Sequence, residues 1–160
     1  SMWFSFYFIR ISPNGLIMRK CILGMLVLFG MTTQAQNQEV QQTIEIFFKG
    51  FHSRDSLAIQ KVCSDKMGLQ SIAENAKGSQ FSTDTASKFY KSIASIPNTM
   101  QFEERLLGHT IHIDGAMAID WTPYQFYVNG KKSHSGVNVF TLYKDNGQWK
   151  IVAIIDTRRK

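Results

Sequence analysis

Residues 121–158, WTPYQFYVNGKKSHSGVNVFTLYKDNGQWKIVAIIDTR, decide the fold of this 160-residue chain. Asn129-Gly130 and the run DNG at 145–147 are hairpin-turn signals, and long extended apolar runs flank both of them. Upstream, Asp114-Gly115 marks another turn of this kind. The pattern predicts an antiparallel meander whose strands span 101–113, 116–128, 131–144 and 148–157.

Helical spacing of apolar residues precedes this meander. Ser53-Arg54-Asp55 is a capping run, so we expect one helix before it, at 39–51, and a second after it, reaching Cys63. A third helix is capped by Thr83 or Asp84 and ends before Pro97. We expect 67–73 to be extended and 75–79 to be a loop. Helices followed by a strand meander indicate an α+β domain with the helices packed on the sheet.

The N-terminus resembles a secretory leader. Met18-Arg19-Lys20 is a basic start, 21–31 is an apolar run, and small residues at Thr33 and Ala35 suit a signal peptidase. We therefore predict a signal peptide at 18–35 and a periplasmic or secreted protein; an uncleaved anchor is the alternative. The apolar run is shorter than the roughly 20 residues that span a bilayer, so no stable membrane insertion is expected after cleavage.

The whole chain has an ordinary globular composition, with 44% hydrophobic and 19% charged residues, and 39–160 is expected to form a single domain. We interpret 1–17 as an extension from a mis-assigned start or from cloning. The formal charge of +6 comes partly from the leader, and the other basic residues are scattered, so a nucleic-acid partner is not expected. Cys63 is then the lone cysteine, for which a buried structural role is favoured over a reactive thiol. No residue spacing suits a metal or a phosphate-binding loop, so neither a metal nor a cofactor is expected.

Two-residue turns predict the strand register. They place His109 opposite Asp120, Trp121 opposite Asn138 and Gln125 opposite His134. One face then carries Trp121, Gln125, His134 and Asn138, and the other carries Tyr124 with the His109–Asp120 pair. Both faces are too apolar to be simply solvated, so we expect helices to cover one and a partner subunit to cover much of the other, in a homodimer.

The layout of the chain resembles a known superfamily. Helices before a bent sheet that ends in GQWKIVAIIDTRR (147–159) are similar to the nuclear transport factor 2-like (SnoaL-like) superfamily, and 121–158 is similar to a bacterial family named for lumazine binding. The resemblance covers roughly 39–160. It implies a single SnoaL-like α+β domain, a cone in which three N-terminal helices pack on a strongly bent antiparallel sheet and close a pocket. Ser135 stands where relatives carry cysteine, so thiol chemistry is not expected there.

These patterns nominate two sets of site residues. A small-molecule site needs aromatic walls and a few convergent polar groups. The candidates for it are Trp121, Tyr124, Gln125, His134, Asn138, Asp156 and Arg158. The catalytic candidates are His109 and Asp120, because a carboxylate orients an imidazole and raises its pKa. An ordinary cross-strand polar pair is the alternative for the latter, and satisfied core polar groups are the alternative for His134 and Asn138. For Asp156 and Arg158 the alternative is a solvent-exposed ion pair at the chain end.

Three functions follow from these candidates. The leading hypothesis is an exported, non-catalytic domain that binds a small molecule in an aromatic-lined pocket. The alternative is a general acid–base enzyme of the hydrolase, isomerase or dehydratase type, which uses His109 and Asp120, or His134, in the cone. A further alternative is a dimeric structural or interaction module whose cavity is filled by its own side chains.

Overall fold

The computed structural model describes the backbone of residues 14–160 and the side chains from Gln34 onward. The chain divides into two compact units, Ser1–Gln36 and Asn37–Lys160, and helix α1 (Asn14–Ser53) contributes residues to both. The predicted leader at 18–35 lies within α1, and most of the predicted extension at 1–17 lies outside the described residues. Within the described part, no helix is both long and apolar enough to cross a membrane.

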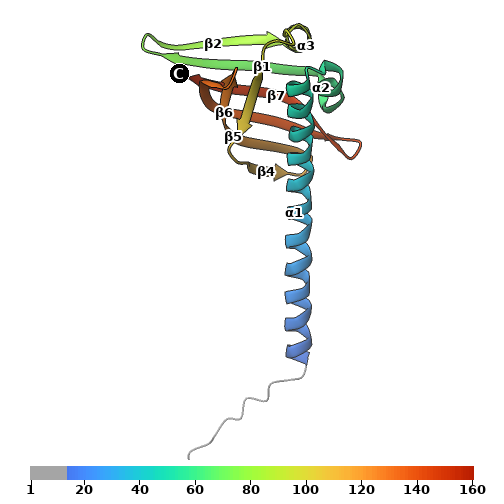
Figure 1. The fold of residues 1–160 in the computed structure, drawn as a ribbon. Coiled ribbons are helices and arrows are strands. Elements are labelled where there is room, and N and C mark those ends of the chain that lie inside the picture. The colour runs from blue at the N-terminus through green and yellow to red at the C-terminus, as the bar shows by residue number, and fades with distance from the viewer. Residues whose placement is uncertain (1–13) are drawn as a thin grey trace, which may run out of the picture. The chain divides into compact units, whose positions relative to one another are not determined.

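The unit Asn37–Lys160 is a curved mixed sheet with helices on one side (Figure 1). After α1 come α2 (Ser56–Val62), β1 (Cys63–Asn75), β2 (Gly78–Thr85), α3 (Ala86–Ala94), β3 (Phe102–Leu106), β4 (Thr110–Asp114), β5 (Met117–Val128), β6 (Lys131–Asp145) and β7 (Gln148–Arg159). The strand order is β2-β1-β7-β6-β5-β3, and β4 also pairs with β5. Every neighbouring pair is antiparallel except β1 with β7, which is parallel. The predicted α+β class is confirmed.

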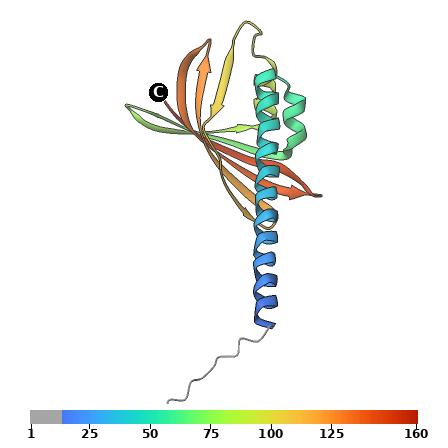
Figure 2. The ribbon, with the colours of Figure 1, turned by 60° about the horizontal axis from the view of Figure 1, so that its bottom comes forward.

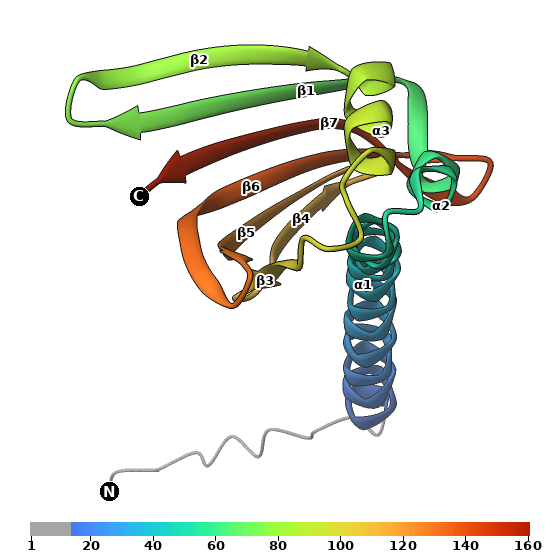
Figure 3. The ribbon, with the colours of Figure 1, turned by 45° about the horizontal axis from the view of Figure 1, so that its top comes forward.

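The hydrophobic core lies between the helices and the inner face of the sheet. Phe47 and Phe48 of α1 both meet the ring of Phe140 on β6 edge-on, with centroids 5.7 and 5.8 Å apart. Leu142 of β6 and Ile151 of β7 are fully buried in the same cluster. Figure 2 shows the strong twist of the sheet, and Figure 3 shows α2 and α3 lying together at one side of it.

The helix caps were partly predicted. Asp55 caps α2, where its side chain accepts from the backbone N–H of Ala58 at 3.0 Å, so the predicted capping run is confirmed. Helix α2 ends at Val62, and Cys63 begins β1 instead of ending the helix. The third helix is capped by Thr85, because the residues before it form β2. This edge strand is exposed at every position, so its sequence lacks the alternation of apolar and polar residues that marks a half-buried strand.

The predicted strand at 101–113 is two strands, β3 and β4, separated by 107–109. Both pair with β5, on either side of Pro123. The backbone N–H of Leu107 donates to the carbonyl of Pro123 at 2.8 Å, but proline has no N–H to donate in return. The ladder therefore breaks at this point, and the link 107–109 leaves the strand direction.

The predicted register of β4 on β5 was wrong by two residues. The turn is centred on Gly115 and Ala116, because Asp114 pairs with Met117, and Gly115 has φ +58° at the first central position. Asp120 consequently lies opposite Ile111 and not opposite His109.

The predicted register of β6 on β5 was wrong by one residue beyond the turn. Asn129 and Gly130 form the expected turn, both with positive φ, but a bulge at Ser133 adds one residue to β6. Trp121 therefore lies opposite Val139, and Gln125 lies opposite Ser135. Because strand side chains alternate between faces, this shift separates Trp121 and Gln125 from the face that carries Asn138.

Candidate functional site

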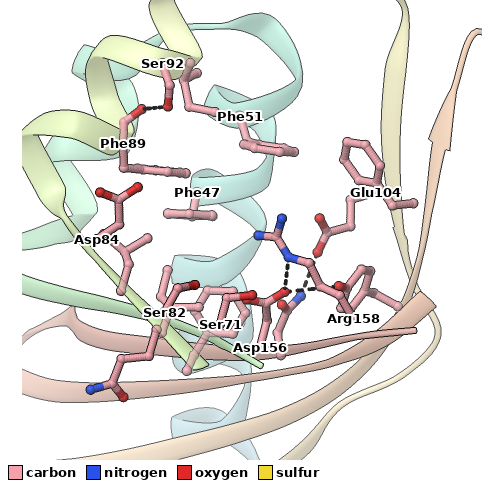
Figure 4. A pocket seen from close by; sticks show the side chains of 18 of the residues that line it. Phe47, Phe51, Ser71, Ser82, Asp84, Phe89, Ser92, Glu104, Asp156 and Arg158 are labelled. Carbon is pink, nitrogen blue, oxygen red and sulfur yellow. Dashed lines mark hydrogen bonds and ion pairs between the residues drawn. The ribbon is translucent and has the colours of Figure 1, made fainter. Parts of the chain in front are cut away.

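A cavity of about 560 Å³ opens between the helices and the inner face of the sheet. Figure 4 shows side chains from α1, α3 and the sheet pointing into it. Its apolar walls come from Phe47, Phe48, Phe51, Leu69, Ala73, Phe89, Ile93, Phe126, Phe140 and Ile154. Its polar lining comes from Gln70, Ser71, Ser82, Thr83, Asp84, Lys88, Ser92, Glu104, Tyr124, His134, Asn138, Asp156 and Arg158. A volume of this size and a largely aromatic wall are typical of small-molecule sites.

The helical side of the cavity is a wall of parallel aromatic rings. Phe89 of α3 stacks on Phe47 and on Phe51 of α1, at centroid distances of 6.0 and 6.5 Å and interplanar angles of 4° and 6°. On the sheet side, Phe126 stacks on His134 at 4.9 Å. Such faces favour a flat ring as the body of a ligand.

A charged pair lies on the sheet side of the cavity. The Nε of Arg158 donates to Oδ2 of Asp156 at 2.7 Å, and both residues belong to β7. The hydroxyl of Tyr124 on β5 lies 2.9 Å from the carbonyl of Thr157 and 3.2 Å from Oδ2 of Asp156. Burial is the main cause that raises the pKa of Tyr124, so this phenol stays protonated and donates.

Glu104 of β3 has a raised pKa and keeps its proton to a higher pH than an ordinary carboxyl does. Burial raises the pKa of its carboxyl to about 7, and the nearby Asp156 adds to this, while the hydrogen bond from Asn138 and the charge of Arg158 oppose it. Nδ2 of Asn138 donates to Oε1 of Glu104 at 2.6 Å. The backbone N–H of Glu104 donates to Nε2 of His52 at 2.9 Å, which ties β3 to the end of α1.

His52 and His134 are neutral bases near this cluster. Burial is the main cause that lowers the pKa of both imidazoles, and Arg158 and Lys160 lower that of His134 further. Nδ1 of His134 lies 3.1 Å from the hydroxyl of Ser133 at the bulge. At neutral pH His134 therefore adds hydrogen-bonding capacity to the cavity and no charge, whereas His52 does not line the cavity.

The structure brings together five of the seven predicted ligand-binding residues. Tyr124, His134, Asn138, Asp156 and Arg158 line the cavity. The predicted placement of the other two was wrong. Trp121 is 52% exposed and does not line the cavity, and neither does Gln125, whose Oε1 accepts from the hydroxyl of Tyr127 at 2.9 Å. The bulge at Ser133 is the cause, because it reverses which residues of β5 share a face with His134.

The predicted pair of His109 and Asp120 forms but lies elsewhere. Nδ1 of His109, in the link between β3 and β4, is 2.6 Å from Oδ2 of the fully buried Asp120. Burial raises the pKa of Asp120, and the hydrogen bond and charge of His109 oppose that rise. Neither residue lines the cavity, so the prediction of an acid–base pair within the cone was wrong. The pair instead holds the link against β5.

Sequence reasoning missed Glu104, although a signal for it exists. Phe102, Glu104 and Leu106 alternate with the exposed Glu103 and Arg105, so a strand puts Glu104 on the same face as two apolar side chains. Phe47 and Phe48 of α1 belong to the hydrophobic core and also line the cavity. Among the described residues, no group of three or more acidic, histidine or cysteine side chains could hold a metal ion.

The curved sheet, its covering helices and the cavity between them define a cone-shaped α+β domain. This architecture is the nuclear transport factor 2-like fold, as comparison with solved structures shows. A nuclear transport factor 2-like protein from Cytophaga hutchinsonii matches with a TM-score of 0.62 at 12% identity, over 78% of this chain and 98% of its own. One of unknown function from Shewanella baltica matches with a TM-score of 0.57 at 13% identity, over 79% and 95%.

A protein of unknown function from Mycobacterium tuberculosis is also similar, with a TM-score of 0.65 at 11% identity over 81% of this chain and 75% of its own. No protein-family profile and no curated protein sequence matches the chain. The predicted superfamily fold is therefore confirmed. The closer resemblance to the family named for lumazine binding stays a prediction.

Proposed function

We propose that this chain is an exported domain that binds a small molecule in the cavity between its helices and its sheet. One observation carries the proposal: parallel aromatic rings and a cluster of hydrogen-bonding groups face the same space of about 560 Å³. Side chains that only completed the core would fill this space. The open cavity thus favours ligand binding over a purely structural module.

Export is part of this proposal and rests on the leader at 18–35. The compact unit Asn37–Lys160 begins just after Ala35, the predicted cleavage point, so cleavage there would leave the whole unit intact. Fractionation of the native host and N-terminal sequencing of the mature protein test it. Recovery of the uncleaved chain in the cytoplasm would contradict it.

Native mass spectrometry of the protein from its own host tests ligand binding. We expect a co-purified molecule, released on denaturation. Ser71→Phe puts a ring into the cavity and should abolish the extra mass, whereas Ser79→Phe, on the exposed end of the β1–β2 hairpin, should retain it. An extra mass that survives Ser71→Phe, or its absence from the parent protein, would contradict the proposal.

We further propose that the outer face of the sheet pairs with a second copy of the chain. Trp121 and Met117 of β5 are each 52% exposed. Val139 of β6 lies beside Trp121, and Ile155 of β7 lies beside Val139, so these apolar residues share that face. An exposed apolar surface of this kind is typical of an interface. In a homodimer its partner is the same patch, related by twofold symmetry.

Trp121→Glu should weaken this homodimer by roughly 30-fold or more, because a charge replaces an exposed aromatic anchor on this face. Sedimentation equilibrium gives the dimer dissociation constant. Leu57→Glu is the matched control: Leu57 is 69% exposed on α2, so the same change there should leave the constant unaltered. A monomeric parent protein, or equal effects of both changes, would contradict the proposed interface.

General acid–base catalysis is the second candidate function, and Glu104 favours it. A carboxyl that holds its proton up to a pH of about 7 can both donate and accept a proton near neutrality. In this candidate Glu104 takes the role that the sequence had suggested for His109 and Asp120. Turnover of a bound ligand that is lost in Glu104→Gln, while binding is retained, would distinguish an enzyme from a binding protein.

A further inference from the structure

The charges around the cavity nearly cancel one another. Arg158 is paired with Asp156 at 2.7 Å, and Lys88 is paired with Asp84 at 3.2 Å. His134 is held neutral by burial, and Glu104 keeps its proton up to a pH of about 7. An ionic ligand that left water for this cavity would find no unpaired opposite charge, so its desolvation would be poorly offset.

The cavity nevertheless offers hydrogen-bond donors that the protein does not use. Arg158 donates through Nε, and neither of its Nη atoms makes a hydrogen bond within the described part of the chain. Glu104 accepts from Asn138 through Oε1, whereas its Oε2 has no partner among the described residues. Figure 4 shows the guanidinium of Arg158 and the carboxyl of Glu104 on the same side of the cavity, across from Phe47 and Phe51. A protonated Glu104 would donate through Oε2.

We propose that the ligand is an uncharged molecule with a planar ring that carries a carbonyl-type oxygen, a proposal that rests on the proposed function. The ring stacks on the parallel faces of Phe47, Phe51 and Phe89. The oxygen accepts from the Nη atoms of Arg158 and from the carboxyl hydrogen of Glu104. The apolar wall thus selects the body of the ligand, and the unused donors select its head group.

Binding of such a ligand should depend on the protonation of Glu104. The groups that face it are His52 from α1, Tyr124 from β5, Asn138 and His134 from β6, and Asp156 and Arg158 from β7. Above a pH of about 7 the carboxyl loses its donor hydrogen and gains a negative charge beside the ligand oxygen. Affinity for an uncharged acceptor should therefore fall as the pH rises through that value.

Three probes with one ring body test this inference: naphthamide, naphthoate and naphthylmethylammonium, which differ in having an uncharged, an anionic or a cationic head. At about pH 6, calorimetry should show naphthamide binding roughly tenfold more tightly than either ion. By about pH 8.5 its affinity should fall by roughly tenfold. Glu104→Gln keeps Oε1 as the acceptor for Asn138 and places a permanent N–H donor at the other position, so it should bind naphthamide equally at both pH values.

Arg158→Met should weaken naphthamide binding by roughly tenfold, because it removes the second donor. Arg159→Met is the matched control, since Arg159 does not line the cavity and pairs with Glu74 at 3.0 Å. The inference would be overturned if either ion bound more tightly than naphthamide, or if the parent protein bound naphthamide equally at both pH values. Equal losses of affinity in Arg158→Met and Arg159→Met would also overturn it. None of these results would contradict the proposed function. Binding of none of the probes also overturns it, and the native mass spectrum then decides separately on the proposed function.

Discussion

Replacing Gly136 with alanine is expected to lower the free energy of unfolding by about 3 kcal/mol, the upper part of the range for an overpacked core. A Cβ atom at this position of β6 would lie 1.7 Å from the carbonyl oxygen of Thr157 on β7. That contact is with backbone, so no side-chain rotation relieves it. The two strands must move apart instead.

The same movement should damage the ligand site. The carbonyl of Thr157 accepts from the hydroxyl of Tyr124, and the neighbours of Thr157 on β7 are Asp156 and Arg158. A shift of β7 at this point displaces the charged pair on the sheet side of the cavity. Naphthamide affinity should therefore fall even where the variant remains folded.

Gly68→Ala is the matched control for this change. A Cβ at Gly68 of β1 would meet no atom within 4 Å. Alanine also loses less conformational freedom on folding than glycine, so Gly68→Ala should be neutral or slightly stabilising. Urea unfolding of both variants gives the comparison. If Gly136→Ala were as stable as Gly68→Ala, the close approach of β6 and β7 would be wrong.

Glu104→Gln is expected to make the domain more stable at about pH 8, by up to about 3 kcal/mol. The folded state holds the carboxyl proton up to about 7, whereas an unperturbed glutamate loses it near 4.5. Between these values the folded state binds more protons than the unfolded state, so stability falls as the pH rises. Below about pH 4 the carboxyl is protonated in both the folded and the unfolded state, so the parent protein and Glu104→Gln should have nearly the same free energy of unfolding.

The difference between variant and parent isolates this effect from other titrating groups. Urea unfolding should give nearly equal stabilities for the two proteins at about pH 4, a gap that opens between about pH 4.5 and 7, and a constant gap above. Glu103→Gln is the control, because Glu103 is exposed on the other face of β3 and pairs with Arg105 at 2.8 Å. A pH-independent difference for Glu104→Gln would contradict the raised pKa of the half-buried Glu104 carboxyl.

Local sequence signals predicted much of the fold because the physics behind them is local. Positive φ at Asn129 and Gly130 follows from the residue types, and so does the capping of α2 by Asp55. Apolar periodicity identified the helical residues that pack on the sheet. These signals depend on neighbours within a few positions, so they can be recognised without knowing how the rest of the chain folds.

The errors arose where backbone pairing between distant segments decides the structure. Strand β2 is polar and exposed, and it forms by hydrogen bonding to β1. The break between β3 and β4 depends on Pro123, which lies on another strand. No turn-type residue in the sequence indicates the bulge at Ser133, yet this bulge moves Trp121 and Gln125 to the outer face.

The sequence alone determined an α+β domain, predicted a leader before it, and offered Tyr124, His134, Asn138, Asp156 and Arg158 as candidates for one site. Tertiary structure decided that these five meet, that Glu104 joins them from β3, and that His109 and Asp120 lie apart from the cavity. The physical reason is the two-residue period of a strand. Composition and turns define which segments pair, but one bulged residue reverses every side chain beyond it, and only the assembled sheet shows where that residue lies.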